Sequence, residues 1–197
     1  YKTEKTIKVL KGLSHNFEKG KIYSVMGPSG SGKSTLLNLI SLIDRPSSGS
    51  IIFNDNQVNF NNTENNDVFR SKKIGIVYQQ NNLLPDFTAL ENIYLASLAV
   101  NNNKELAVKK AKKLLTKIGL SKRSDHFPSQ LSGGEAQRVA IARAIVNDPE
   151  IILADEPTGS LDMETAIDIF ELLNKQKRSD RLIIFATHNR FFANKAD

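Results

Sequence analysis

A glycine-rich segment near the beginning of the chain matches the spacing G-x-x-x-x-G-K-[ST]. It lies between a strand-like apolar run, Ile22–Met26, and a helical pattern, Leu36–Ile43. In that context the spacing predicts a loop whose backbone N–H groups surround phosphate groups, at a helix N-terminus that adds partial positive charge. A simple Gly/Ser turn with an unrelated lysine is the alternative, and the flanking pattern disfavours it. The predicted phosphate loop comprises Gly27, Pro28, Ser29, Gly30, Ser31, Gly32, Lys33, Ser34 and Thr35.

Two side chains of this loop have predicted roles of their own. Lys33 is expected to reach the outer phosphates of a nucleotide, and the Ser34 hydroxyl is expected to bind Mg²⁺.

Four short apolar runs predict a sheet that is buried on both faces. They are nearly continuous rather than alternating, which is typical of parallel strands covered by helices. Each run is followed by polar residues, and ligands of open parallel sheets bind at the carboxyl ends of the strands. One shared site is therefore expected at the ends of Ile22–Met26, Ile74–Tyr78, Ile151–Ala154 and Leu182–Ala186.

The segments between these runs predict a small peripheral β piece and several helices. Ser50–Phe53 predicts a short antiparallel strand, and the Asn-rich segment 54–66 predicts a loop. Helical spacing is found in Lys104–Ile118, which stops at Gly119, in Glu135–Val146 and from Ala166 onwards.

This order of elements predicts an α/β fold with a mainly parallel core sheet and flanking helices. The mostly helical stretch from about Pro85 to Val146 falls between two sheet strands, so it is expected to form a helical subdomain. We expect a single domain over residues 1–197.

Two acidic residues follow the third apolar run. Asp155 is suited to hold Mg²⁺ beside a phosphate loop, and Glu156 could polarise an attacking water as a general base. Two solvated acids in a turn are the alternative, and the phosphate loop makes that interpretation unfavourable.

Gln79 and His188 follow the second and fourth runs. In isolation each is explained by a polar strand end, or by a capping or surface histidine. Beside a phosphate loop, Gln79 is expected to bind Mg²⁺ or position water and to report the nucleotide state to a partner. His188 lies at the same predicted edge.

A second predicted anion site lies at Ser132, Gly133, Gly134 and Glu135. Serine is a favoured N-cap, and glycines expose backbone N–H groups at the start of a helix. A plain helix cap would explain Ser132 but not both glycines. One phosphate tail does not need two such helix starts from one subunit, so we expect a head-to-tail dimer that holds each nucleotide between two copies.

Composition excludes several classes of protein. There is no cysteine, so neither disulfides nor thiolate metal sites are possible. The formal net charge of +6 fits an anionic ligand, a membrane surface or nucleic acid equally well. No apolar run approaches the roughly 18–20 residues of a membrane-spanning helix. The chain begins at Tyr1 rather than Met, so we expect that both ends are trimmed.

Together these motifs resemble the nucleotide-binding domain of ATP-binding cassette (ABC) proteins over essentially the whole chain. The order is that of the family: the phosphate loop, the Q-loop at Gln79, the signature Leu131–Glu135, the Walker B strand ending at Asp155 and Glu156, the D-loop at Ser160-Leu161-Asp162 and the H-loop at His188. The resemblance implies that Tyr1 stacks on adenine.

The resemblance also implies the mechanism and the partners. Two copies would close on two ATP·Mg²⁺, Glu156 would act as the base, and His188 would contact the γ-phosphate. The cycle would drive transmembrane permease subunits that contact the segment from Gln79 to Asn92. The chain would then lie at the cytoplasmic face of a bacterial inner membrane.

Within the family, Asn82–Asn92, Pro128–Glu135 and Gln137–Ala144 resemble the group of lipoprotein-releasing (LolD-type), MacB-type and FtsE-type ATPases, and the first segment most resembles the lipoprotein-releasing branch. Glu135 stands where many members carry Gln, and Asn189 where Asp is usual. The chain also stops at Asp197, before the family's last strands and helix.

Efflux or cell-division complexes remain alternatives, as does a non-transport ABC ATPase that acts on DNA or ribosomes. Gln79 and Leu131 are too close in sequence for the long coiled coil of DNA-repair members. The lysine-rich run from Lys109 to Arg123 could indicate nucleic acid, but a solvated helix face, aided by a nearby anionic membrane, is favoured. We therefore expect no nucleic-acid partner.

Overall fold

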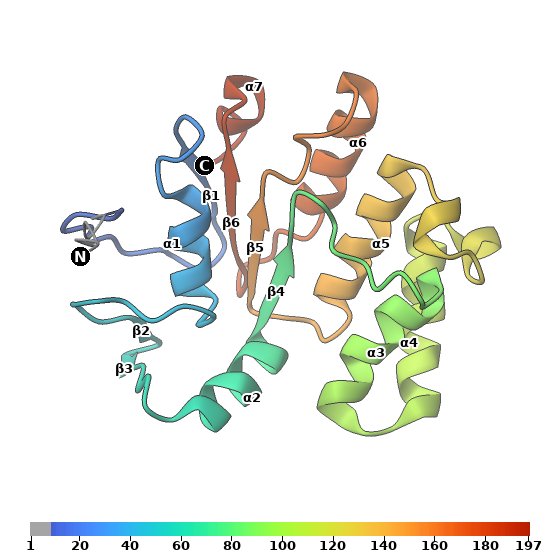
Figure 1. Ribbon diagram of the computed structural model, residues 1–197, viewed down its shortest axis with the longest axis horizontal. Coiled ribbons are helices and arrows are strands. Elements are labelled where there is room, and N and C mark those ends of the chain that lie inside the picture. Colours follow the sequence, from blue (N-terminus) through green and yellow to red (C-terminus); the bar gives the residue numbers. More distant parts are fainter. Residues whose placement is uncertain (1–8) are drawn as a thin grey trace, which may run out of the picture.

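Four parallel strands form the centre of the molecule, in the order β1-β6-β5-β4 (Figure 1). The structure is a computed structural model that describes residues 9–197. The strands are β1 (Ile22–Met26), β4 (Ile74–Val77), β5 (Ile151–Asp155) and β6 (Leu182–Thr187). All four predicted strands are confirmed, with ends that differ by at most one residue.

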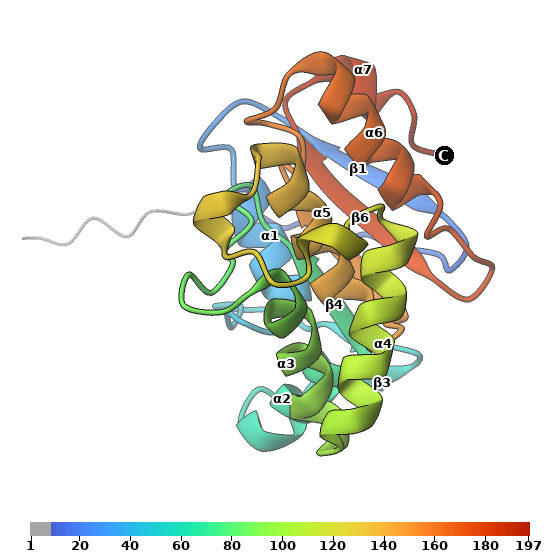
Figure 2. The ribbon, with the colours of Figure 1, turned by 90° about the vertical axis from the view of Figure 1, so that its right-hand side faces the viewer.

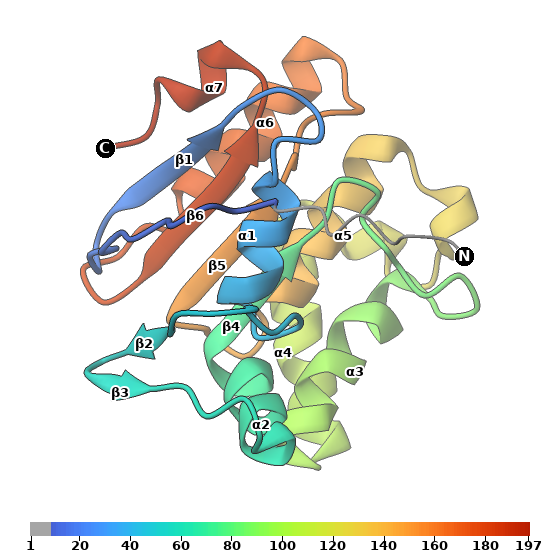
Figure 3. The ribbon, with the colours of Figure 1, turned by 60° about the vertical axis from the view of Figure 1, so that its left-hand side comes forward.

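Helices cover both faces of this sheet. α1 (Lys33–Ile40) lies on one face, in front of the strands in Figure 3, while α5 (Gly133–Ile145), α6 (Met163–Asn174) and α7 (Arg190–Ala193) lie on the other. Side chains of β5 alternate between the two layers: Leu153 packs in the core on the α1 side and Ile152 in the core on the α6 side. Burial on both faces explains why the strands are continuously apolar.

A helical layer lies within residues 85–146, the stretch predicted to form a helical subdomain. α3 (Ala89–Asn101) and α4 (Lys104–Lys117) pack beside α5, as Figure 2 shows from the side. Ile93, Leu115 and Val139 belong to its core. Two short 3₁₀ turns, Ser121–Arg123 and Pro128–Gln130, connect α4 to α5. Of the three α-helices in this layer, α3 was absent from the predicted helical segments.

The Asn-rich segment 54–66 was predicted to be a loop, and this prediction was wrong in part. Its first residues complete a hairpin between β2 (Ile52–Phe53) and β3 (Asn56–Gln57), and its last residues begin α2 (Thr63–Lys73). Asparagine favours turns, but it also caps helices: here the Asn62 side chain accepts the Asn65 N–H at 3.1 Å. No α2 residue is buried, so the pattern gave little sign of this helix.

Within residues 9–197, no helix has both the length and the apolar character needed to cross a bilayer. Tyr1, the predicted adenine-stacking residue, lies outside the described residues.

Candidate nucleotide-binding site

The phosphate loop lies between β1 and α1, at the carboxyl edge of the sheet. Gly30 and Gly32 adopt left-handed backbone conformations, with φ of 78° and 92°, which turn the chain into the helix. Within the described chain, no side chain caps α1 at Gly32. The N–H groups of the first turn are therefore available to an anion at the positive end of the helix dipole.

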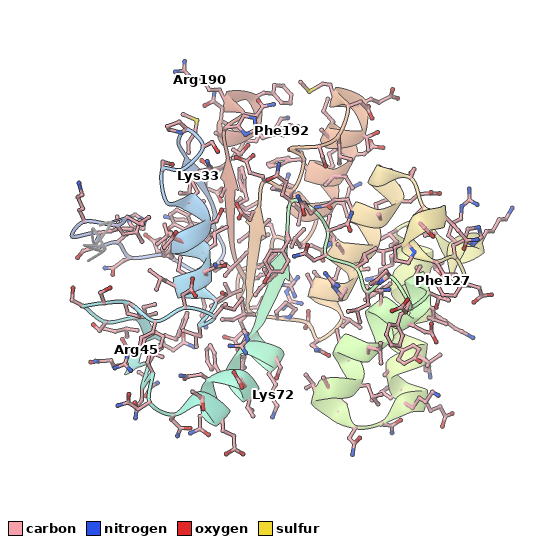
Figure 4. All side chains as sticks on the ribbon, viewed as in Figure 1. Lys33, Arg45, Lys72, Phe127, Arg190 and Phe192 are labelled. Atoms are coloured by element: carbon pink, nitrogen blue, oxygen red, sulfur yellow. The ribbon has the colours of Figure 1, made fainter. Side chains whose placement is uncertain are left out.

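Lys33 is the first residue of α1 and lies next to this loop (Figure 4). Its ammonium donates to the carbonyl oxygens of Gly27 at 2.9 Å and Pro28 at 3.1 Å. The same Nζ lies 3.6 Å from Oε1 of Glu156, and both side chains are about nine-tenths buried. The positive charge is thus held between the phosphate loop and the end of β5.

Glu156 has an unusual backbone conformation directly after β5. Its φ is +46°, a left-handed conformation that costs a non-glycine residue on the order of 1 kcal/mol or more. The Glu156 N–H donates to Ala186 O on β6 at 3.0 Å, which holds the turn in place. Oε1 lies 2.9 Å from Nδ1 of His188, whose side chain is mostly exposed. The structure therefore brings Lys33, Glu156 and His188 together.

Asp155 provides a test of the predicted Mg²⁺ site. Its Oδ1 is buried and has no hydrogen-bond partner within the described residues, so an acceptor remains unsatisfied at the edge of the sheet. Residues 9–197 contain no cluster of three or more His, Asp or Glu side chains suited to a metal. One carboxylate plus a hydroxyl fits the way Mg²⁺ binds beside nucleotide phosphates, which supply further oxygens.

Gln79 is exposed beside the turn that follows Glu156. A Cβ atom added to Gly159 would lie 3.1 Å from the Gln79 amide nitrogen, so the glutamine occupies the space that a larger residue at 159 would fill. A cavity of about 130 Å³ adjoins Glu156 and His188 on the α6 side. Gln79 and His188 therefore lie at the edge where the sequence predicted them.

The second predicted anion site, Ser132–Glu135, lies well away from the phosphate loop of the same chain (Figure 1). Ser132 Oγ accepts the Glu135 N–H at 3.2 Å, and the Glu135 carboxylate accepts the Ser132 N–H at 2.8 Å. This bond from the Ser132 backbone, aided by Arg123, holds the pKa of Glu135 below its usual range. Glu135 is thus bonded within its own helix start.

The two glycines of this segment are explained differently. A Cβ at Gly134 would lie 2.5 Å from Thr165 Cγ2 on α6, whereas one at Gly133 would meet only an ordinary contact with Leu161 at 3.4 Å. Gly134 is therefore required by the packing of α5 on α6, a reason that the sequence did not reveal.

Two polar residues of α5 were missed by the sequence analysis. Gln137, which is buried, donates to Tyr78 O at 3.2 Å. Arg143 donates to Asn82 O and Asn81 O, each at 2.7 Å. Polar residues on an otherwise buried helix face were the only signal available.

Comparisons with known proteins agree with this geometry. Residues 10–159 match the family model described as ABC transporter. The lipoprotein-releasing system ATP-binding protein LolD 2 of Chlorobium chlorochromatii is 44% identical over 200 residues, covering 98% of this chain and 83% of that protein. The corresponding LolD protein of Cytophaga hutchinsonii is 41% identical over 198 residues, covering 100% of this chain and 90% of that protein.

Among solved structures, the dimeric post-hydrolysis state of the ATP-binding cassette MJ0796 bound to ADP and Pi superimposes with a TM-score of 0.90. The two sequences are 40% identical, and the aligned region covers 100% of this chain and 87% of the MJ0796 chain. The family match, the relatives and this structural likeness agree with the phosphate loop and the parallel sheet described above, and the chain belongs to the ABC transporter family as an ATP-binding cassette.

Proposed function

We propose that this chain is the ATP-hydrolysing subunit of a transporter that releases lipoproteins from a bacterial inner membrane. The observation that carries the proposal is the near-full-length similarity, at 41–44% identity, to proteins named as ATP-binding subunits of lipoprotein-releasing systems. The site geometry supports the ATPase chemistry independently. The chain would act at the cytoplasmic face of the membrane, as a peripheral subunit.

The phosphate loop would hold the phosphates of ATP. Backbone N–H groups at the start of α1 would donate to phosphate oxygens. The Lys33 ammonium would exchange its bonds to the carbonyls of Gly27 and Pro28 for bonds to phosphate oxygens, which are stronger acceptors. Ser34, Asp155 and Gln79 would hold Mg²⁺, which would neutralise charge on the β- and γ-phosphates.

Glu156 would act as the general base. Its carboxylate would accept a proton from the attacking water while the water oxygen bonds to the γ-phosphorus and the bond to the β–γ bridging oxygen breaks. The products would be ADP and inorganic phosphate. Because the left-handed turn is held by the bond to Ala186 O, the carboxylate would keep its direction through the reaction.

His188 and Gln79 would complete the site around this base. His188, 2.9 Å from the Glu156 carboxylate, would contact the γ-phosphate with its other ring nitrogen. Gln79 would position the water or the metal. It would also respond to movement of the membrane partner, because it begins the segment from Gln79 to Asn92 on which that partner is proposed to dock.

Each nucleotide would be completed by a second copy of the chain. Ser132 and Gly133 are exposed at the start of α5, and the phosphate loop of the same chain lies elsewhere. A homodimer that forms on ATP binding would place this helix start against the partner copy's nucleotide. The related MJ0796 cassette is described as dimeric, which supports this arrangement.

The transmembrane partner would dock on the segment from Gln79 to Asn92. Leu84 and Phe87 are 44% and 38% exposed, and Phe127 beside the start of α3 is 42% exposed (Figure 4). Asn92 is buried and donates to the carbonyls of Leu84, Phe87 and Thr88. This holds an apolar surface toward solvent, as expected for a protein contact.

Replacement of Glu156 by Gln tests the ATPase. The amide keeps the shape of the side chain but cannot accept the water proton, so turnover should fall by at least about 100-fold while ATP binding remains. ATP-dependent dimers should accumulate, as measured by light scattering. Wild-type turnover in Glu156→Gln would exclude Glu156 as the base.

Co-purification of the full-length protein with its native membrane partner tests the transport assignment. Reconstituted with that partner, the wild-type ATPase should release a lipoprotein from vesicles in an ATP-dependent way, and Glu156→Gln should not. A partner of the drug-efflux or cell-division type would contradict lipoprotein release and leave the ATPase assignment intact.

A further inference from the structure

The loop that carries Gln79 is held from both sides by side chains of α5. Before Gln79, the Gln137 amide donates to Tyr78 O at 3.2 Å. After Gln79, the two Nη atoms of Arg143 donate to Asn82 O and Asn81 O, each at 2.7 Å. Gln79, proposed to bind metal or water, thus lies between backbone carbonyls that all accept hydrogen bonds from side chains of α5.

The backbone at these carbonyls needs such support. Asn81 and Asn82 both have left-handed conformations, with φ of 49° and 47°. Asparagine tolerates this conformation better than most residues, yet two in succession are uncommon. The direction of the two carbonyls, and hence of the chain on either side, depends on a donor that can bond both at once.

Arg143 is well suited to be that donor. A guanidinium carries several N–H groups in a rigid plane, so it can serve two acceptors, whereas a lysine ammonium is a point charge on a flexible stem. In the described part of the chain, its bonds go to these carbonyls and it forms no ion pair with a carboxylate. Burial lowers the pKa of the Arg143 guanidinium, so a charged group is kept here at an energetic cost.

The same helix begins at the signature segment. α5 runs from Gly133, capped by Ser132, to Ile145, and Arg143 lies in its last turn. A rigid helix therefore joins the proposed partner-copy phosphate contact at one end to the Gln79 loop at the other. Movement of the segment from Gln79 to Asn92 would therefore be transmitted to the start of α5 as well as to the Gln79 loop.

From these contacts we propose that Arg143 is a positioning residue for ATP hydrolysis. It fixes the Asn81–Asn82 turn and thereby sets the position of Gln79 relative to Glu156 and to α5. The inference rests on the proposed ATPase function. It concerns the rate of the chemical step and its response to the membrane partner rather than ATP affinity.

Arg143→Lys tests this role with the charge retained. Because an ammonium cannot span both carbonyls in the fork geometry, kcat should fall about tenfold, while KM for ATP changes less than about twofold. Stimulation of turnover by the membrane partner should fall as well. Arg138→Lys is the matched control, because Arg138 lies on the same helix in a partly exposed ion pair with Asp168, and it should leave kcat unchanged.

A double variant separates positioning from general destabilisation. If Arg143 acts through Gln79, Arg143→Lys combined with Gln79→Ala should lose no more than Gln79→Ala alone. Amide hydrogen exchange should also become faster in residues 79–82 of Arg143→Lys and remain unchanged in β5 and β6.

Three results would overturn the inference: wild-type kcat and partner stimulation in Arg143→Lys, losses that multiply in the double variant, or unchanged turnover in Gln79→Ala. Each would leave the behaviour of Glu156→Gln, and with it the proposed ATPase, unaffected. If Arg143→Lys does not fold, the positioning role is overturned in favour of a structural one.

Discussion

Glu156 combines a strained backbone conformation with a buried carboxylate. A glycine would relieve the left-handed φ of 46°, but it would remove the carboxylate that lies between Lys33 and His188. The neighbouring Ala186 carbonyl holds the backbone, so strain at one residue is balanced by a bond from the adjacent strand. The neighbours of Glu156 therefore fix the position of its backbone and carboxylate in the absence of a ligand.

Gly134→Ala is expected to destabilise the protein by about 1–3 kcal/mol, since its methyl group would meet the Thr165 Cγ2 methyl at 2.5 Å. Thr165→Ser removes that methyl and keeps the hydroxyl. Urea unfolding should therefore show most of the loss restored in the double variant. If Gly134→Ala causes the same loss with and without the Thr165→Ser change, the packing explanation is contradicted.

Residue identity alone gave only part of this site. The phosphate loop, Asp155, Glu156 and His188 follow strands in the sequence, so their convergence follows from a parallel sheet. Arg143 could not be found this way, because its acceptors are backbone carbonyls far away along the chain. The packing reason for Gly134 likewise depends on α6, whose distance from α5 no local pattern encodes.

At the scale of elements, α5 contacts both the loop that carries Gln79 and strand β4. Ser132 and Glu135 form a capping box at its N-terminus. Its backbone also approaches β4 so closely that a Cβ atom at Gly75 would lie 2.3 Å from Ala144 O. That close approach fixes the helix against the sheet. Sequence periodicity predicted α5 well, because amphipathic spacing and an N-cap both mark it. The exposed α2 has no buried residue, and its Asn-rich beginning favoured a loop instead.

The helix start should respond to acid. The folded-state pKa of Glu135 is lowered, chiefly by the Ser132 N–H bond, so its carboxylate stabilises the fold above its ordinary pKa of 4.5, and this contribution is lost as the pH falls through the lower folded value. The difference in unfolding free energy between wild type and Glu135→Gln should therefore shrink as the pH falls below about 4.5. A difference that grows toward low pH would contradict the assignment.

At the scale of the whole molecule, the proposed nucleotide site is divided between two faces. The phosphate loop and Glu156 lie together at the carboxyl edge of the sheet. The start of α5 lies apart from the phosphate loop (Figure 1). If each nucleotide is enclosed by two copies, defects on the two faces belong to different halves of a site.

Mixing two inactive variants should reveal this division. Lys33→Ala disables the phosphate-loop face and Ser132→Arg obstructs the α5 face, so a mixed dimer contains one site with both defects and one intact site. ATP turnover should return on mixing. Mixing Lys33→Ala with Glu156→Gln is the control: both changes affect the phosphate-loop face, so no intact site forms and turnover should remain absent.

The order of the strands has a consequence for folding during synthesis on the ribosome. In the described sheet β1 pairs with β6 alone, and Ile22 lies opposite Ile183. The phosphate loop is made before the other strands of the described sheet, yet the strand that leads into it lacks its partner β6 until those strands have been made. Such distant pairing slows folding and leaves an apolar strand uncovered in the meantime. Nascent chains should therefore depend on chaperones until β6 emerges, and ATP capture should be acquired only after β6 has paired with β1.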